Sequence, residues 1–159
     1  YKIVFVKKFI FSILIFLLPL LAFFQSNDVI TEILESPEVT YGQICYLSAV
    51  EQGFVGESAS YEEVIQVLYE KGQLPELVNS NEPIALVNLA YIYTRLWNVK
   101  GGLLFRLTKG SPRYALKQLK ADAIVDSNWD PTMKLTGEQA LNLYTSCLYY
   151  YGKQTLEIE

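Results

Sequence analysis

Acidic side chains are the first candidates for chemistry, because paired carboxylates can cleave a glycosidic bond or hold a cation. Asp126, Asn128 and Asp130 stand at alternate positions, as at the start of a calcium-binding loop. Such a loop needs Gly at its sixth position, where the chain has Pro131, and the acid Glu138 comes one residue late to close it. We expect a capped turn here and no bound metal, with a calcium site as the alternative.

The composition limits the other kinds of catalytic site. The chain has no His, which excludes Ser-His and Cys-His nucleophile systems, and its two Cys cannot complete a Cys/His zinc site. It contains no glycine-rich phosphate-binding motif. The acids Glu62, Glu63 and Glu138 lie at expected helix starts, where a carboxylate stabilises the helix dipole without catalysis. We expect no enzymatic activity and no cofactor, a wall hydrolase being the alternative.

Positive charge is concentrated in one segment. Between Pro83 and Ala121 the chain has no acid and seven bases. The rest of the chain beyond Ser26 has three bases and all 17 acids. The whole part beyond Ser26 therefore has a net charge of −7. The seven bases are Arg95, Lys100, Arg106, Lys109, Arg113, Lys117 and Lys120. Such a segment either attracts polyanions or forms a solvated helix face. Arg106, Arg113 and Lys117 are our candidate ligand-binding bases.

Tyrosines supply the second set of candidate contacts. Tyr149, Tyr150 and Tyr151 follow one another at the end of the last expected helix. Successive helical residues point about 100° apart, so the three rings cannot all face one core. Exposed rings can stack on sugars or dock a protein, and the alternative is packing against the C-terminal tail. We take Tyr149 and Tyr150 as candidate ligand contacts.

A repeat organises the elements that must position these residues. Residues 61–100 align without a gap on residues 112–151, and each unit reads as helix, polar loop, helix with apolar residues at three- and four-residue spacing. The expected helices cover 61–72, 84–97, 112–123 and 136–151. A partial third copy has a helix at 39–50 and a short first helix at 27–36. We expect the longest connection, 102–111, to be an ordered loop or a short extended piece.

Two of the second helices start with a capping box. Thr40 is followed three residues later by Gln43, and Thr136 by Gln139. In this motif the Thr hydroxyl accepts from the amide of the third helical residue, whose side chain accepts from the cap amide. These four residues are predicted structural caps. Three units that are too small to bury their apolar faces alone should pack against one another.

The last unit, RYALKQLKADAIVDSNWDPTMKLTGEQALNLYTSCL, resembles an S-layer homology (SLH) repeat. The resemblance rests on the small Ala123, the apolar pair that follows it, Pro131 in the loop, and Thr136-Gly137-Glu138-Gln139-Ala140 at the start of the second helix. Residues 61–100 fit the pattern more loosely. The resemblance covers about residues 28 to 152.

This resemblance implies an all-α fold of about three helix-loop-helix repeats in a pseudo-threefold bundle, with units near 28–52, 60–100 and 111–152. It also implies binding to cell-wall polysaccharide. The family's binding Arg lies in its Thr-Arg-Ala-Glu motif, at a position that holds Tyr41, Leu86 and Gly137 in this chain. We expect Arg106 and Arg113 to supply the positive charge that the motif Arg provides in the family. A tetratricopeptide-type repeat is the alternative fold, but the 51-residue offset is long for it.

The N-terminal segment predicts export. Lys2, Lys7 and Lys8 precede an unbroken apolar run from Phe9 to Phe24. This order is typical of a secretory signal, and an uncleaved membrane anchor is the alternative. Residues 1–26 are therefore assigned to a signal or anchor and residues 27–159 to the repeat domain, located in the periplasm or cell envelope.

Two functional hypotheses follow for an exported domain of this kind. The first is non-catalytic binding of a cell-wall glycan or peptidoglycan, and the second is a protein-interaction or scaffolding domain that has lost glycan binding. Neither involves nucleic acid, and the membrane is reached only through an uncleaved N-terminal segment. Cys45 and Cys147 lie in apolar helical patterns and are expected to be buried thiols, with a disulfide as the alternative that export permits.

Overall fold

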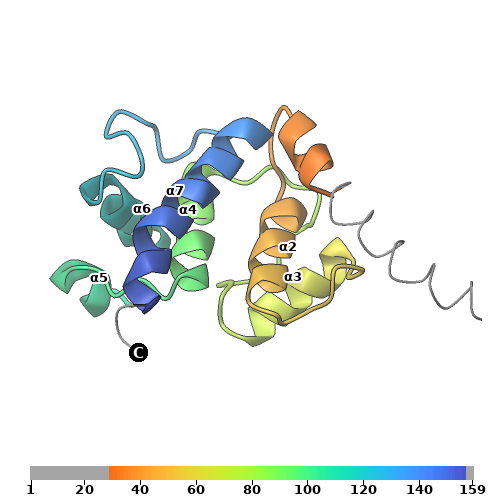
Figure 1. The fold of residues 1–159 in the computed structure, drawn as a ribbon, viewed down its shortest axis with the longest axis horizontal. Helices are drawn as coiled ribbons and strands as arrows, with labels where there is room; N and C mark the ends of the chain where they lie inside the picture. Colours follow the sequence, from red (N-terminus) through yellow and green to blue (C-terminus); the bar gives the residue numbers. More distant parts are fainter. Residues whose placement is uncertain (1–28, 157–159) are drawn as a thin grey trace, which may run out of the picture. The chain divides into compact units, whose positions relative to one another are not determined.

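The computed structural model describes residues 29–156, and within that range it is built of α-helices without strands (Figure 1). The expectation of an all-α fold is confirmed. The chain divides into two compact units, Tyr1–Glu32 and Ile33–Glu159, and the sites considered below lie in the second. The predicted signal or anchor at 1–26 lies outside the described residues. Among the residues described, no helix combines the length and apolarity needed to cross a membrane.

The helices follow the expected order with small shifts at their ends. Residues 29–35 form the short helix expected at the start of the first repeat, residues 28–52. The named helices are α2 Tyr41–Glu51, α3 Tyr61–Glu70, α4 Leu86–Leu96, α5 Leu103–Leu107, α6 Pro112–Ala121 and α7 Gly137–Leu156. Helix α2 is buried from Tyr41 to Ala49. Helices α3 and α6 each bury one apolar face, so their apolar residues recur at the three- and four-residue spacing of an amphipathic helix.

The core lies where the second helices of the repeats pack on the first helix of the following repeat and on one another. Helix α2 packs on α3 and α4, and α4 packs on α6 (Figure 1). Tyr93 on α4 is fully buried and donates from its hydroxyl to the carbonyl of Ala140 on α7, 3.1 Å away. Its ring also makes edge contacts with Tyr144 and Trp97. Much of the tyrosine content therefore lies between helices.

Three segments that precede α2, α4 and α7 are hydrogen-bonded to one another, and we name these segments, 36–42, 80–87 and 131–137, the hub. The first and second are joined by Tyr41 N to Glu82 O (3.0 Å) and Ile84 N to Val39 O (2.9 Å). The second and third are joined by Leu86 N to Met133 O (2.9 Å) and Val87 N to Pro131 O (3.0 Å). The third and first are joined by Val39 N to Leu135 O and Gly137 N to Ser36 O, both 2.9 Å.

The hub contacts fall at corresponding positions of the aligned units. Val39, Ile84 and Leu135 align with one another and are all completely buried. Each lies one residue before the N-cap of its helix, so the hub fixes where the three long helices begin. The pseudo-threefold bundle stays a prediction.

Both capping boxes make their reciprocal hydrogen bonds. The Thr40 amide donates to Gln43 Oε1 at 3.1 Å and the Gln43 amide donates to Thr40 Oγ1 at 3.3 Å. The same pair of bonds joins Thr136 and Gln139 at 3.0 and 3.3 Å. Ala85 occupies the corresponding position of α4 and has no side-chain cap.

The connection 102–111 is neither a loop nor an extended piece, and this expectation was wrong. Residues Leu103–Leu107 form the short helix α5, which packs on α6. The Gly102 amide at its start donates to Gln118 Oε1 on α6, 2.9 Å away, and Phe105 is buried beneath the helix. Tertiary contacts hold this helix, because five residues are too few to be stable alone.

Candidate ligand-binding site

Phe105 fixes the geometry around the basic residues of the acid-free segment. Its ring lies against Gly101 and Gly110, whose φ values are +51° and +62°. A Cβ at Gly101 would stand 2.4 Å from the ring, and one at Gly110 would stand 2.8 Å from it. These glycines provide both the left-handed backbone and the space for the ring. Helix α5 is therefore clamped where the chain turns into it and out of it.

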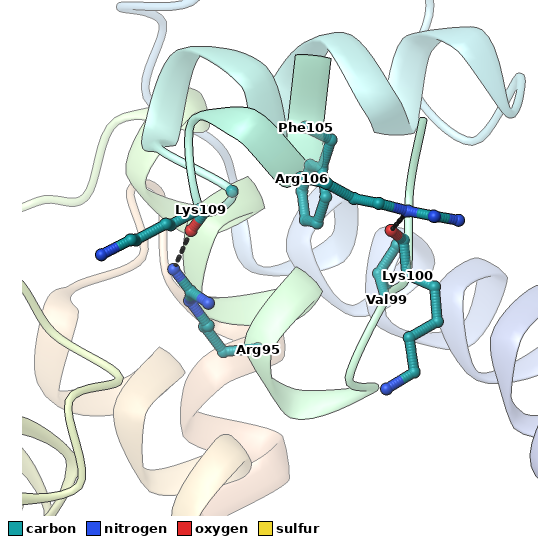
Figure 2. Close-up of a pocket in the computed structure, with 7 residues that line it drawn as sticks. Arg95, Val99, Lys100, Phe105, Arg106 and Lys109 are labelled. Atoms are coloured by element: carbon teal, nitrogen blue, oxygen red, sulfur yellow. Dashed lines mark hydrogen bonds between the residues drawn. The ribbon is translucent and has the colours of Figure 1, made fainter. Parts of the chain in front are cut away.

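A pocket of about 530 Å³ opens around this clamp (Figure 2). Its walls come from the end of α4, the connection to α5, α5 itself and the turn before α6. The lining residues are Arg95, Val99, Lys100, Phe105, Arg106, Lys109 and Gly110. Four of the seven residues are cationic and none is acidic, so every charged side chain that lines the pocket is positive. We name it the basic pocket.

Arg95 ties two walls of the basic pocket together. Its Nη2 donates to the carbonyl of Lys109 and, at 3.3 Å, to the hydroxyl of Tyr91. Its guanidinium carbon lies 4.7 Å from the centre of the Tyr91 ring, a cation–π contact. Within residues 29–156, its buried Nε has no hydrogen-bond partner. Arg95 therefore both braces the pocket and leaves one N–H donor unsatisfied in its wall.

The four cations do not converge on one point. Figure 2 shows Arg95 and Lys109 on one side of Phe105, and Arg106 and Lys100 on the other. Arg106 Nε donates to the carbonyls of Lys100 and Gly101, both at 3.2 Å, which turns the far end of its guanidinium outward. Because the charges are spread along the pocket, it suits an anion that carries several charges along its length better than one small ion.

The other candidate bases lie elsewhere. Arg113 and Lys117 are exposed on α6 and do not line the basic pocket. The ammonium of Lys117 lies 4.9 Å from the centre of the Tyr114 ring. Lys120 donates to the carbonyls of Ser127 and Trp129 at 2.9 and 2.7 Å, so its charge closes a turn. Of the three bases selected from the sequence, the structure places only Arg106 in the pocket.

The candidate tyrosines line a second, separate pocket, also of about 530 Å³, on the outer side of α7. Tyr149 and Tyr150 are 69% and 41% exposed, whereas Tyr151 is buried and donates to Asp122 Oδ2. The expectation that at least one of the three rings is exposed is confirmed. The remaining walls are Asp122, Ala123, Ile124, Asn142, Thr145 and Ser146. Bases and tyrosines therefore form two sites, not one.

The sequence resemblance to SLH repeats points to three positions for a binding Arg, which are Tyr41, Leu86 and Gly137 in this chain. Tyr41, Leu86 and Gly137 are all buried. Tyr41 accepts from Asn88 Nδ2 at 2.7 Å, and a Cβ on Gly137 would stand 1.6 Å from the carbonyl oxygen of Ile33. Tyr41 also lines a small cavity of about 40 Å³, which contains Glu76 and no base, so none of the three positions offers a positive charge to an anion.

The turn at 126–132 uses its acids in local hydrogen bonds. Asp126 Oδ1 accepts from the Asn128 amide at 2.9 Å, and Asp130 Oδ1 accepts from the Thr132 amide at 2.7 Å. The hydrogen bonds from Thr132 lower the pKa of Asp130. This is the capped turn that we expected. A search of the described residues found no group of three or more acids or cysteines able to hold a metal ion.

Cys45 and Cys147 are free and completely buried. Burial raises the pKa of each thiol to about 12. A thiol with such a pKa is not nucleophilic near neutral pH. The expectation of two buried thiols is confirmed, and both act as small apolar core residues.

Sequence reasoning missed three members of the basic pocket as ligand residues: Arg95, Lys100 and Lys109. The concentration of bases pointed to the segment, but which of them gather depends on the fold of residues 98–111. Gly101 and Gly110 on either side of Phe105 were the available signal.

Comparison with models of known families, with curated proteins and with solved structures finds no match for this chain.

Proposed function

We propose that this chain is a non-catalytic domain of the cell envelope that binds an anionic cell-wall glycan through the basic pocket. One observation carries the proposal: four cations and no carboxylate line a single pocket, in a domain whose net charge is negative. Charge segregated in this way favours a polyanion over other partners. The expected export of the chain makes a wall polymer the available polyanion.

The hub supports degenerate SLH-like repeats as the origin of the domain. Segments at corresponding positions of the three aligned units are hydrogen-bonded in a closed series, first to second, second to third and third to first. A pseudo-threefold bundle accounts for this pattern, because equivalent segments then meet around one axis. In such a bundle the first repeat has a short first helix at 29–35. The glycan would bind in the basic pocket instead of at the motif positions of SLH repeats.

The proposal is tested by co-sedimentation of the chain with purified sacculi, with and without their attached polymers, in mild detergent and over a salt series. The pocket variant is Arg106→Gln/Lys109→Gln. Its matched control, Arg113→Gln/Lys117→Gln, removes the same two charges from the same acid-free segment but outside the pocket. We expect polymer-dependent binding that salt weakens. The pocket variant should lower the affinity about tenfold, and the control should lower it less.

Two results would overturn this assignment. Equal losses in the two variants would mean that diffuse charge, and not the pocket, attracts the polymer. No sedimentation with either preparation of sacculi would remove the glycan as ligand. Circular dichroism of each variant establishes that the fold is retained.

A second function, docking of an envelope protein, is favoured by the end of α7. Leu148, Tyr149 and Tyr150 expose 43%, 69% and 41% of their surface next to one another in sequence. Neighbouring exposed aromatic and aliphatic side chains are typical of protein contacts. Cross-linking from a photoreactive residue placed at Tyr149 tests this function. A specific envelope protein captured there and lost in Leu148→Ser would support it, and unchanged capture in that variant would contradict it.

A further inference from the structure

Three neighbouring leucines on α5 are unusually exposed. Leu103, Leu104 and Leu107 leave 74%, 57% and 71% of their surface open. The fourth apolar residue of the helix, Phe105, is buried. Isolated exposed leucines are normal in proteins, but three on five consecutive residues form an apolar patch that marks a contact surface.

The leucines are presented on a fixed base. Phe105 is held between two glycines, and the Gly102 amide is bonded to Gln118 on α6. The hydroxyl of Thr108 donates to the carbonyl of Leu104 at 2.8 Å, which closes the end of the helix. Because these contacts leave the leucine side chains outside, no part of the chain that the structure describes buries the leucines.

Exposed bases flank the leucines in sequence. Lys100 precedes α5, Arg106 lies within it and Lys109 follows it, and all three are exposed. The chain has no acid from Pro83 to Ala121, so nothing local in sequence neutralises them. Exposed leucines among bases are the combination that partitions into the interface of an anionic bilayer, with apolar groups at the acyl boundary and cations at the headgroups.

We infer that α5 is a lipid-docking element, which inserts Leu103, Leu104 and Leu107 into the surface of an anionic bilayer. Lys100, Arg106 and Lys109 then lie among the anionic headgroups. This contact goes beyond glycan binding and is distinct from the N-terminal apolar segment. A glycan offers no apolar phase for leucines, and a symmetric contact with a second copy would bring these cations against one another.

A fluorescent label at position 104 of the full chain tests the inference. The variant Leu104→Cys is labelled with an environment-sensitive nitrobenzoxadiazole, since Cys45 and Cys147 are completely buried and the sequence has no other Cys. The matched control is Leu77→Cys, because Leu77 is 56% exposed, close to the 57% of Leu104, but lies next to Glu76. The probes are vesicles of phosphatidylcholine alone and of equal parts phosphatidylcholine and phosphatidylglycerol.

We expect a blue shift and protection from iodide at position 104 on the anionic vesicles alone, with the label at position 77 unchanged. In the labelled chain, Leu103→Ser/Leu107→Ser should raise the lipid concentration needed for half of the shift about tenfold or more. Lys100→Gln/Lys109→Gln should raise it by about tenfold as well, and salt should act in the same direction. The N-terminal segment could bind both kinds of vesicle, but the label reports whether α5 itself enters the bilayer, and the leucine and lysine variants share the same N-terminal segment.

Three outcomes would overturn the inference. The label at 104 could stay open to iodide while the chain sediments with anionic vesicles. It could shift with sacculi but not with vesicles, which would assign α5 to the glycan surface. It could shift on concentration of the protein alone, which would assign α5 to self-association. The Leu103→Ser/Leu107→Ser variant separates the two proposals, since it should leave sacculus binding unchanged.

Discussion

Gly137 lies at the position where the sequence resemblance to SLH repeats points to a binding Arg. It is the first residue of α7, and its amide donates to the carbonyl of Ser36. The carbonyl oxygen of Ile33 occupies the place where a Cβ would stand. A side chain at this position is therefore incompatible with the approach of the short first helix. The sequence shows a glycine where the SLH motif has its Arg, but only the fold explains why no larger residue fits.

We predict that Gly137→Ala lowers the free energy of unfolding by about 3 kcal/mol, because the overlap is with a backbone oxygen and one of the two segments must move. Urea unfolding measures the loss. Gly56→Ala is the control, since a Cβ there would have nothing within 4 Å and its φ is not left-handed. It should change the free energy of unfolding by less than about 0.5 kcal/mol. Similar losses in the two variants would show that the hub tolerates displacement of the first helix.

At the scale of the helices, periodicity and caps predicted nearly every long element. Helices α3 and α6 each bury one face, and α2 begins within the expected capping box, with Thr40 as its N-cap and Gln43 as its third residue. Helix α5 was missed because five residues span less than two turns and most of its apolar residues face outward. Its stability comes from Phe105 and from α6, which local sequence patterns do not report.

The two capping boxes are chemically identical but differ in burial. Thr40 is half-buried, whereas Thr136 is exposed. Gln43 is 4% exposed and its side chain also donates to Ser36 Oγ at 2.9 Å, whereas Gln139 is half-buried. Removal of a cap hydroxyl leaves a backbone amide without its acceptor, and water can replace that acceptor only where it has access. We predict a loss of about 1 kcal/mol for Thr136→Ala and about 2 kcal/mol for Thr40→Ala.

Urea unfolding of the two Thr→Ala variants side by side measures this difference. Each variant removes the same atoms from the same motif, so each serves as the control for the other. Equal losses would mean that burial of the first box adds nothing to its contribution. A larger loss at Thr136 would contradict the physical reason directly.

At the scale of the whole molecule, the fold gathers charges that the sequence only groups. The acid-free segment was evident, yet its seven bases separate into the basic pocket, the exposed surface of α6 and the turn that Lys120 closes. The path of residues 98–111 sets this division, because it brings Lys109 back to Arg95. Sequence reasoning therefore located the basic segment and Arg106 but could not show that Arg113 and Lys117 lie outside the pocket.

The buried core predicts how stability depends on alkaline pH. Burial raises the pKa of Cys45 and Cys147 from 9.0 to about 12, and it raises the pKa of the fully buried Tyr93 well above its usual value of 10.0. Above about pH 9 the unfolded chain releases thiol protons that the folded chain retains. The stability due to these protons is complete below pH 9 and is lost as the pH rises towards 12. Each thiol contributes a slope of up to roughly 1.4 kcal/mol per pH unit.

Urea unfolding between pH 7 and 11 tests this dependence. Tyrosines also begin to ionise in the unfolded chain as the pH approaches 10, so the thiol contribution between about pH 9 and 10 is measured as a difference in slope between two chains, with and without the thiols. Cys45→Ala/Cys147→Ala should flatten the slope in that interval and leave the steeper decline above it, which Tyr93 and the other buried tyrosines cause. The comparison uses slopes, because loss of the sulfur atoms also lowers stability at every pH. An unchanged slope in the double variant would show that the thiols ionise alike in both states, and would place the alkaline sensitivity on the tyrosines between α4 and α7.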